Sequence, residues 1–225
     1  MVEIQIVKLS NDIPFSFSLL SHVQFDKRLR IMGCRSSEEK KRSLVGELLI
    51  RKAVKDKLNI PFHKIRISHN QYGKPYIDNV NYFKFNISHS GCYVVIATST
   101  HKVGVDIEKI QPVDLGVASR FYTEKEYKYI QSLPCDDKKV SEFFRLWTLK
   151  ESYIKAIGKG MKIPLNSFEF DLESGKSFIK ENRNKKYLFY TRSLDDYFLS
   201  VCFMEKDINY DFKALTEEEL YGNFS

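Results

Sequence analysis

The sequence predicts a mixed α/β (α+β) fold of two similar halves, each with a small sheet packed by a long helix. Two observations carry this prediction. Each half runs through the same order of elements: a helix, a strand, a Gly-Lys turn, a strand and a hairpin of two strands. Three segments also match in order at a nearly constant offset, namely 64–68 with 167–171, 73–77 with 175–179, and 83–99 with 187–203. A chance match of patterns is the alternative, because few identities are shared.

The repeat predicts how the chain is divided. We expect an N-terminal half at 1–103 and a C-terminal half at 104–225, related by a pseudo-two-fold axis. A cleft between two such halves is a natural place for a ligand.

The first half is expected to hold one long helix and several short strands. The helix covers 43–58, where apolar residues recur near helical spacing, and Pro61 follows its end. The expected strands show alternation or flanking turn residues: 2–9, 64–68, 71–77 with its Gly73-Lys74-Pro75 turn, 83–88 and 93–99. His89, Ser90 and Gly91 form the predicted hairpin turn between the last two strands.

The second half repeats this pattern with more helix. We expect helical structure over 118–133 and a long helix over 141–160, which ends at Gly158 and Gly160. The expected strands alternate apolar and polar residues: 103–108, 166–172, 176–179, 185–191 and 197–204.

The totals limit the class of protein. The length of 225 residues suits one large domain or two small ones, and a hydrophobic content of 43% supplies a substantial core. The net charge of +7 favours polyanionic partners, although a lysine excess that serves only solubility is the alternative. No apolar run approaches the roughly 20 residues of a membrane span, and we expect no signal peptide. The four cysteines show no ligand spacing, so we expect reduced thiols and a cytoplasmic location.

Two acids in the segment VGVDIE lie two residues apart on a predicted strand. Asp106 and Glu108 therefore share one face, with Cα atoms roughly 6.5–7 Å apart. Two neighbouring carboxylates repel unless cations lie between them, and Mg²⁺ prefers carboxylate oxygens together with waters and substrate phosphates. This spacing predicts a Mg²⁺ site, although a solvated strand face is the commoner reason for such a pair.

Other motifs supply groups for an anion. Glu151 and Lys155 lie at i and i+4 of the long helix, where a surface ion pair is the usual explanation. At the edge of a cleft the same pair serves as a third metal ligand and a phosphate counter-charge. A histidine in a turn, such as His89, can donate to a phosphate, and the alternative is an exposed side chain. Lys74, between Gly73 and Pro75, can hold an anion, and the alternative is a simple turn.

Four motifs together resemble a known family. YGKPYI, FNISHSGCYV, VGVDIEKI and FFRLWTLKESYIKAIGKG resemble the Sfp-type 4′-phosphopantetheinyl transferases in kind, order and spacing, over most of the chain from Lys27 to about Phe203. The resemblance implies an enzyme that binds coenzyme A and Mg²⁺ between two α/β halves. It also implies transfer of the 4′-phosphopantetheine arm to a serine of an apo acyl or peptidyl carrier protein, with release of adenosine 3′,5′-bisphosphate.

The resemblance also implies roles for particular residues. The residues that match metal-binding acids are Asp106, Glu108 and Glu151. The residues that match the coenzyme A site are Lys27, Arg30, Arg42, Ser43, Lys74, Pro75, Ser88, His89 and Lys155. For the general base, Glu151 is the first choice and Glu108 the second, and Glu126 matches a further acid near the site.

The partners follow from the same resemblance. An acidic carrier protein suits a basic enzyme, and the segment 121–137 is a predicted docking surface with Phe121, Tyr122 and Tyr127 as anchors, unless these aromatic residues belong to the core. We expect a monomer with no nucleic-acid or membrane partner. The alternatives are a different Mg²⁺-dependent phosphate enzyme, such as a nuclease, and a non-catalytic basic binding module.

Overall fold

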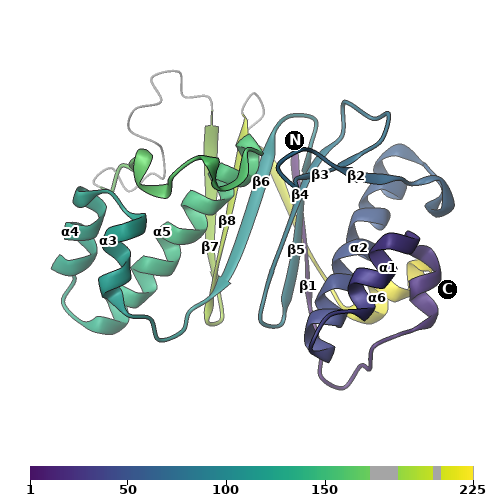
Figure 1. The fold of residues 1–225 in the computed structure, drawn as a ribbon, viewed down its shortest axis with the longest axis horizontal. Coiled ribbons are helices and arrows are strands. Elements are labelled where there is room, and N and C mark those ends of the chain that lie inside the picture. Colours follow the sequence, from purple (N-terminus) through teal and green to yellow (C-terminus); the bar gives the residue numbers. More distant parts are fainter. Residues whose placement is uncertain (173–186, 205–208, 225) are drawn as a thin grey trace.

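Two sheets lie face to face between two helical layers (Figure 1). The computed structural model describes residues 1–172, 187–204 and 209–224. Among the described residues, no helix combines the length and the apolar character that a membrane span requires.

The first sheet has the strand order β4-β5-β1-β9. Its strands are β1 (Val2–Lys8), β4 (Lys84–Ser90), β5 (Tyr93–Ser99) and β9 (Tyr210–Leu215). β5 pairs antiparallel with both β4 and β1, whereas β9 pairs parallel with β1. The helix α2 (Ser37–Leu58) covers the outer face of this sheet.

The second sheet has the order β6-β8-β7 and repeats the connectivity of the first. Its strands are β6 (Val103–Lys109), β7 (Tyr187–Leu194) and β8 (Tyr197–Met204), and the helix α5 (Asp136–Ile157) covers it. In each half, the first strand pairs antiparallel with the second strand of the hairpin. Each half also carries one helix of 22 residues. The predicted fold class is therefore confirmed.

The remaining elements connect or cover these layers. They are α1 (Phe25–Met32), the antiparallel pair β2 (Ile67–His69) and β3 (Pro75–Ile77), α3 (Ala118–Phe121), α4 (Glu124–Ser132) and α6 (Glu217–Tyr221). Short 3₁₀ turns occur at Ser18–His22, Phe62–Lys64, Leu115–Val117, Gly160–Lys162, Leu165–Ser167 and Gly222–Phe224. β9 and α6 return to the first half, and the domain bounds at 1–103 and 104–225 stay a prediction.

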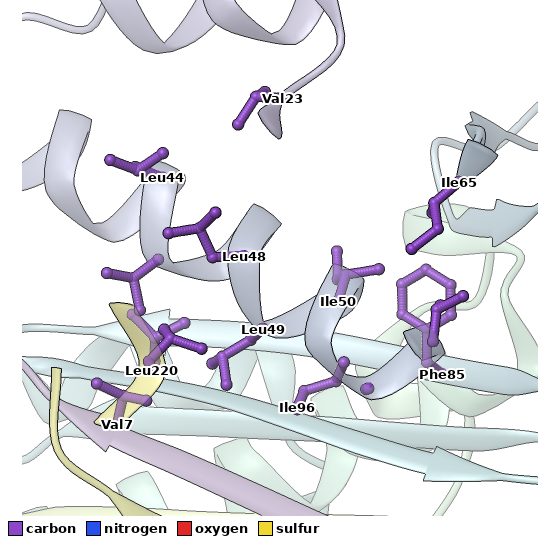
Figure 2. Packing of buried hydrophobic residues seen from close by; sticks show 14 of the residues in the cluster. Val7, Val23, Leu44, Leu48, Leu49, Ile50, Ile65, Phe85, Ile96 and Leu220 are labelled. Atoms are coloured by element: carbon purple, nitrogen blue, oxygen red, sulfur yellow. The ribbon is translucent and has the colours of Figure 1, made fainter. Parts of the chain in front are cut away.

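Alternation sorts the side chains of each strand into two cores. Figure 2 shows Leu48 and Leu49 of α2 lying over Val7 and Ile96 of the first sheet. Residues of the opposite parity in both sheets fill the space between them, including Ile4, Val95, Val105 and Val201. A third core lies around α5 and contains Phe143, Leu146 and Phe170.

Two predicted elements differ from the structure in more than their bounds. The expected helix over 118–133 is split into α3 and α4, because Thr123 and Glu126 form a capping box that starts a new helix. The expected strand over 166–172 is absent apart from a single bridge at Phe170. Its backbone groups bond to side chains instead, since Lys150 donates to the carbonyl of Phe168 and Glu126 accepts from the N–H of Phe170. The expected strand at 176–179 lies outside the described residues.

Candidate functional site

The alternation of β6 presents two acids on the face that packs against α5. Val103, Val105 and Ile107 are fully buried between the two sheets, and Asp106 and Glu108 take the opposite parity. The predicted common face of the two acids is therefore confirmed.

Gly104 allows α5 to lie very close to this face. A Cβ atom at Gly104 would come within 2.0 Å of the carbonyl oxygen of Ser152 and 2.3 Å of the backbone nitrogen of Ala156. Only glycine fits this contact, because a Cβ cannot approach backbone atoms so closely. The missing side chain thereby brings the last turns of α5, with Glu151 and Lys155, next to the acids of β6.

A ladder of side-chain hydrogen bonds joins β4 to β6, the two strands at which the halves meet. Ser88 Oγ donates to Asp106 Oδ1 at 2.9 Å, and Ser90 Oγ donates to Glu108 Oε2 at 2.9 Å. One step earlier, Asn86 Oδ1 accepts from the N–H of Val105 at 2.8 Å. Sequence reasoning missed the partnership of Ser90, although Ser88 and Ser90 repeat the two-residue spacing of the acids that they face.

Lys155 is the cation at the centre of this group. Its Nζ lies 2.6 Å from Asp106 Oδ1 and 3.0 Å from Ser88 Oγ. Asp106 is only 2% exposed, and its Oδ2 has no hydrogen-bond partner among the described residues. A buried carboxylate oxygen without a donor costs free energy and provides a ready ligand for a cation.

The pKa values of Glu108 and Glu151 are both raised. Burial raises the pKa of Glu151, and the charge of Asp106 adds to this effect. Burial and then Asp106 raise the pKa of Glu108 in the same way, while Ser90 and Lys155 oppose the change. Within the described part of the chain, Glu151 makes no hydrogen bond. One ammonium group thus faces three carboxylates, and the group is short of positive charge.

These residues fit a Mg²⁺ ion. Among the described residues, no three His, Cys, Asp or Glu side chains are close enough to hold a metal by themselves. Mg²⁺ does not require such a cage, since it is usually bound by one or two carboxylates, waters and the phosphates of a substrate. The donor-free oxygen of Asp106, beside Glu108 and Glu151, suits that mode of binding.

Two adjoining pockets, together called the groove here, lie between Glu151 and α1. Its first pocket, of about 410 Å³, is lined by Glu151 and Lys155 and by the turn that precedes β3. Its second pocket, of about 180 Å³, is lined by Lys27 and Arg30 of α1. The two pockets share a wall formed by His69, Pro75 and Ile87. The structure therefore places predicted cofactor residues in both pockets.

Three further predicted residues lie on α2 and β4. Arg42 donates to the carbonyl of Gly91 at 3.1 Å, and Ser43 is half-buried beside it on α2. His89 lies within β4 rather than in the hairpin turn, which is formed by Gly91 and Cys92 alone, because Ser90 still pairs with Tyr93. Desolvation by its neighbours, followed by the charges of Arg42 and Lys155, lowers the pKa of His89, although the residue keeps contact with solvent.

The structure gives Lys74 a different environment from the predicted anion site. Its ammonium group bonds to the backbone carbonyls of Val103, Lys155 and Ala156. Burial lowers the pKa of Lys74 to about 8, while the three carbonyls favour the charged form. Pro75, the next residue, does line the groove.

The structure does not bring Glu126 to the acids. Glu126 is fully buried on α4, where it pairs with Lys150 at 2.8 Å and accepts from the N–H of Phe170 at 2.9 Å. α4 lies on the side of α5 that faces away from β6 (Figure 1). The carboxylate of Glu126 therefore stabilises the fold around α5, where it is bound to Lys150 and to the backbone of Phe170.

One predicted docking anchor is buried in the core and the other two are half-buried. Tyr122 is 2% exposed and donates to the carbonyl of Phe143, so the alternative of a core residue holds for it. Phe121 packs edge-on against Trp147 with ring centroids 5.1 Å apart, and Tyr127 is partly buried against the same core.

Comparisons with known proteins show which family the chain resembles. Two family models match adjoining parts of the chain, "4'-phosphopantetheinyl transferase, N-terminal" over residues 14–101 and "4'-phosphopantetheinyl transferase superfamily" over residues 102–202. The 4′-phosphopantetheinyl transferase gsp of Aneurinibacillus migulanus is 42% identical, across 100% of this chain and 95% of the relative. The transferase ffp of Bacillus subtilis is 35% identical, across 90% of this chain and 91% of the relative. Sfp of Bacillus subtilis strain 168 is 32% identical, across 89% of this chain and 91% of the relative.

Proposed function

Because the chain belongs to the 4′-phosphopantetheinyl transferase superfamily, we propose that its donor is coenzyme A, that Mg²⁺ is required, and that adenosine 3′,5′-bisphosphate is released. The chain is an enzyme of this family and transfers phosphopantetheine to carrier proteins. Neither a nuclease nor a non-catalytic binding module fits this family membership.

The groove carries the proposal for coenzyme A. Its first pocket is lined by Glu151 and Lys155. Its second pocket is lined by Lys27 and Arg30, together with the acids Asp26 and Glu47. Coenzyme A has a pyrophosphate near its middle and a 3′-phosphate at its adenosine end. We therefore place the pyrophosphate near Lys155 and the adenosine end near α1, where cationic side chains suit a phosphate.

The residues that would hold Mg²⁺, one or two at a time together with waters and substrate phosphates, come from Asp106, Glu108 and Glu151. Among the described residues, Oδ2 of Asp106 is an atom without a donor. When bound, the ion neutralises charge on the pyrophosphate and on the leaving group. Lys155 supplies further positive charge from α5, and Ser88 fixes the Asp106 carboxylate from β4. Positioning and charge neutralisation supply most of the acceleration in a phosphoryl transfer.

The transfer requires one proton acceptor. The oxygen of the carrier serine forms a bond to the phosphorus that bears the pantetheine, and the bond from that phosphorus to the bridging oxygen breaks. The bridging oxygen leaves with adenosine 3′,5′-bisphosphate, and the serine proton goes to a carboxylate. The pKa values of Glu151 and Glu108 are both raised, but Glu151 suits this role better, because it makes no hydrogen bond within the described residues, whereas Glu108 already accepts from Ser90.

The partner is an acidic apo carrier protein in this proposal. The net charge of +7 supports it, because opposite charge speeds the encounter of two proteins. A monomeric state and a cytoplasmic location stay predictions.

Mass spectrometry tests the proposal directly. The protein is incubated with coenzyme A, Mg²⁺ and apo carrier proteins of the fatty-acid, polyketide and peptide-synthetase types, and each carrier is then weighed. We expect at least one carrier to gain the mass of phosphopantetheine, and the gain should disappear when its serine is replaced by alanine. A mass gain that persists without coenzyme A would contradict the proposed donor.

A further inference from the structure

Lys74 reaches from the first half into the end of α5 in the second half. Its Nζ lies 2.6 Å from the carbonyl oxygen of Lys155, 2.9 Å from that of Val103 and 3.4 Å from that of Ala156. A lysine ammonium group has three N–H donors, and here each has a carbonyl acceptor. No donor is left over for a phosphate unless one of these bonds breaks.

Asn70 makes a second contact from the same turn. Its Nδ2 donates to the carbonyl of Gly158 at 3.1 Å, and its Oδ1 accepts from the N–H groups of Tyr72 and Lys74 at 2.9 Å each. Asn70 thus fixes the turn that presents Lys74 and also holds the residue that ends α5.

These contacts satisfy groups that a helix cannot satisfy itself. The last carbonyls of an α-helix lack partners within the helix, and a cation near them is favourable. Gly158 ends α5 with a φ of 75°, and the two side chains from the β2–β3 turn supply donors to the carbonyls around it. The turn of α5 that they hold carries the side chain of Lys155, whose ammonium group contacts Asp106 and Ser88.

We propose that Asn70 and Lys74 are positioning residues that clamp the end of α5 and thereby place the ammonium group of Lys155 in the active site. Lys74 acts through Lys155 in this proposal, and its ammonium group does not bind coenzyme A. The inference rests on the proposed function for its kinetic consequences, but the clamp itself is a property of the free protein.

A double-mutant cycle separates positioning from direct binding. We expect Lys74→Met to lower kcat on the order of 10- to 100-fold, because a displacement of about 1 Å can cost that much, and to leave KM for coenzyme A nearly unchanged. In a Lys155→Ala background the same substitution should change kcat by less than about threefold, because the two residues act as one unit. The control is Lys102→Met at an exposed lysine, which should leave kcat as in the unchanged protein.

Two results would overturn the positioning role. One is a rise in KM for coenzyme A at constant kcat, which indicates direct contact of Lys74 with the donor. The other is a pair of kcat losses that multiply in the double variant, which indicates that Lys74 acts independently of Lys155.

Hydrogen exchange tests the clamp without any reaction. Asn70→Asp keeps the acceptor for the turn but removes the donor to Gly158, and we expect faster amide exchange in the last two turns of α5, with α2 unchanged. Asn81→Asp, at an exposed position, is the matched control and should leave both helices unchanged. Unchanged exchange in Asn70→Asp would refute the clamp, whereas absent transfer by the unchanged protein would refute only the proposed function.

Discussion

The two oxygens of Asp106 have very different surroundings. Oδ1 accepts hydrogen bonds from Ser88 and Lys155, while Oδ2 is buried without a donor among the described residues. Such an arrangement lowers the stability of the free protein, because an unsatisfied buried oxygen costs on the order of 1–3 kcal/mol. Active sites commonly retain such costs where a ligand later relieves them.

Glu151→Gln is expected to raise the melting temperature of the metal-free protein at pH 7 by a few degrees and to abolish most transfer. The raised pKa of Glu151 means that the folded state disfavours its charge, so a neutral side chain of the same shape is better tolerated. The measurement is thermal unfolding together with a transfer assay. The exposed control Glu218→Gln should change neither, and a lower melting temperature for Glu151→Gln would contradict the reasoning.

His89 should make coenzyme A binding depend on pH. Its pKa lies below the ordinary value of 6.5, so the imidazole is neutral at pH 7 and gains a proton as the pH falls further. A charged His89 binds phosphate more strongly, so affinity for coenzyme A should rise between pH 7 and about pH 5.5. Calorimetric titration measures the affinity for coenzyme A at each pH in the unchanged protein and in His89→Asn. The comparison isolates His89, because the protonation of the coenzyme A phosphates affects both proteins equally. Equal pH dependence of the two proteins would exclude His89 from the site.

At the scale of elements, Gly104 determines how closely α5 can pack on β6. We expect Gly104→Ala to destabilise the protein and to lower kcat, because its Cβ would meet backbone atoms of Ser152 and Ala156 and push Lys155 away from Asp106. Core overpacking typically costs about 1–3 kcal/mol. Chemical denaturation and kinetics measure the two effects, and the matched control is Gly222→Ala, where an added Cβ meets nothing within 4 Å. Unchanged stability in Gly104→Ala would rule out this close contact.

The elements that could be predicted are those whose signals are local. The alternation of β6 and the glycine after α5 are readable from a few residues, and both predictions are confirmed. The missing strand at 166–172 was not readable, because Lys150 and Glu126 are distant in the sequence and take its backbone hydrogen bonds. The roles of Asn70 and Lys74 were not predicted for the same reason, since their acceptors lie in the other half of the chain.

At the scale of the whole molecule, the C-terminal segment, formed by β9 and α6, packs onto the first half. β9 adds to the edge of β1, and α6 packs against α2 with Leu220 in the shared core (Figure 2). Lys41 of α2 pairs with Glu217 of α6 at 2.9 Å, and Glu217 is fully buried. No repeat counterpart of this segment was visible in the sequence, so its return to the first half was not predicted.

The buried pair predicts a large effect from a small change. Glu217→Gln should lower the free energy of unfolding by about 3–5 kcal/mol, because it leaves Lys41 buried without its counter-charge. Chemical denaturation measures this loss. Glu124→Gln is the control, since its pair with Lys128 is exposed and should contribute little to stability. Similar losses in the two variants would show that the C-terminal segment does not depend on this pair.

The measurement that tests the central claim most directly is the Mg²⁺ dependence of transfer. Transfer is measured as the gain in mass of an apo carrier protein incubated with coenzyme A. The unchanged protein should modify the carrier with Mg²⁺ and fail to do so with a chelator, and Asp106→Ala should lose activity by orders of magnitude while it keeps its fold by circular dichroism. The reason is that Asp106 offers the buried oxygen for the ion and holds Lys155 in place. Near-normal transfer by Asp106→Ala, or full transfer in the presence of the chelator, would contradict a metal site at the meeting of β4, β6 and α5.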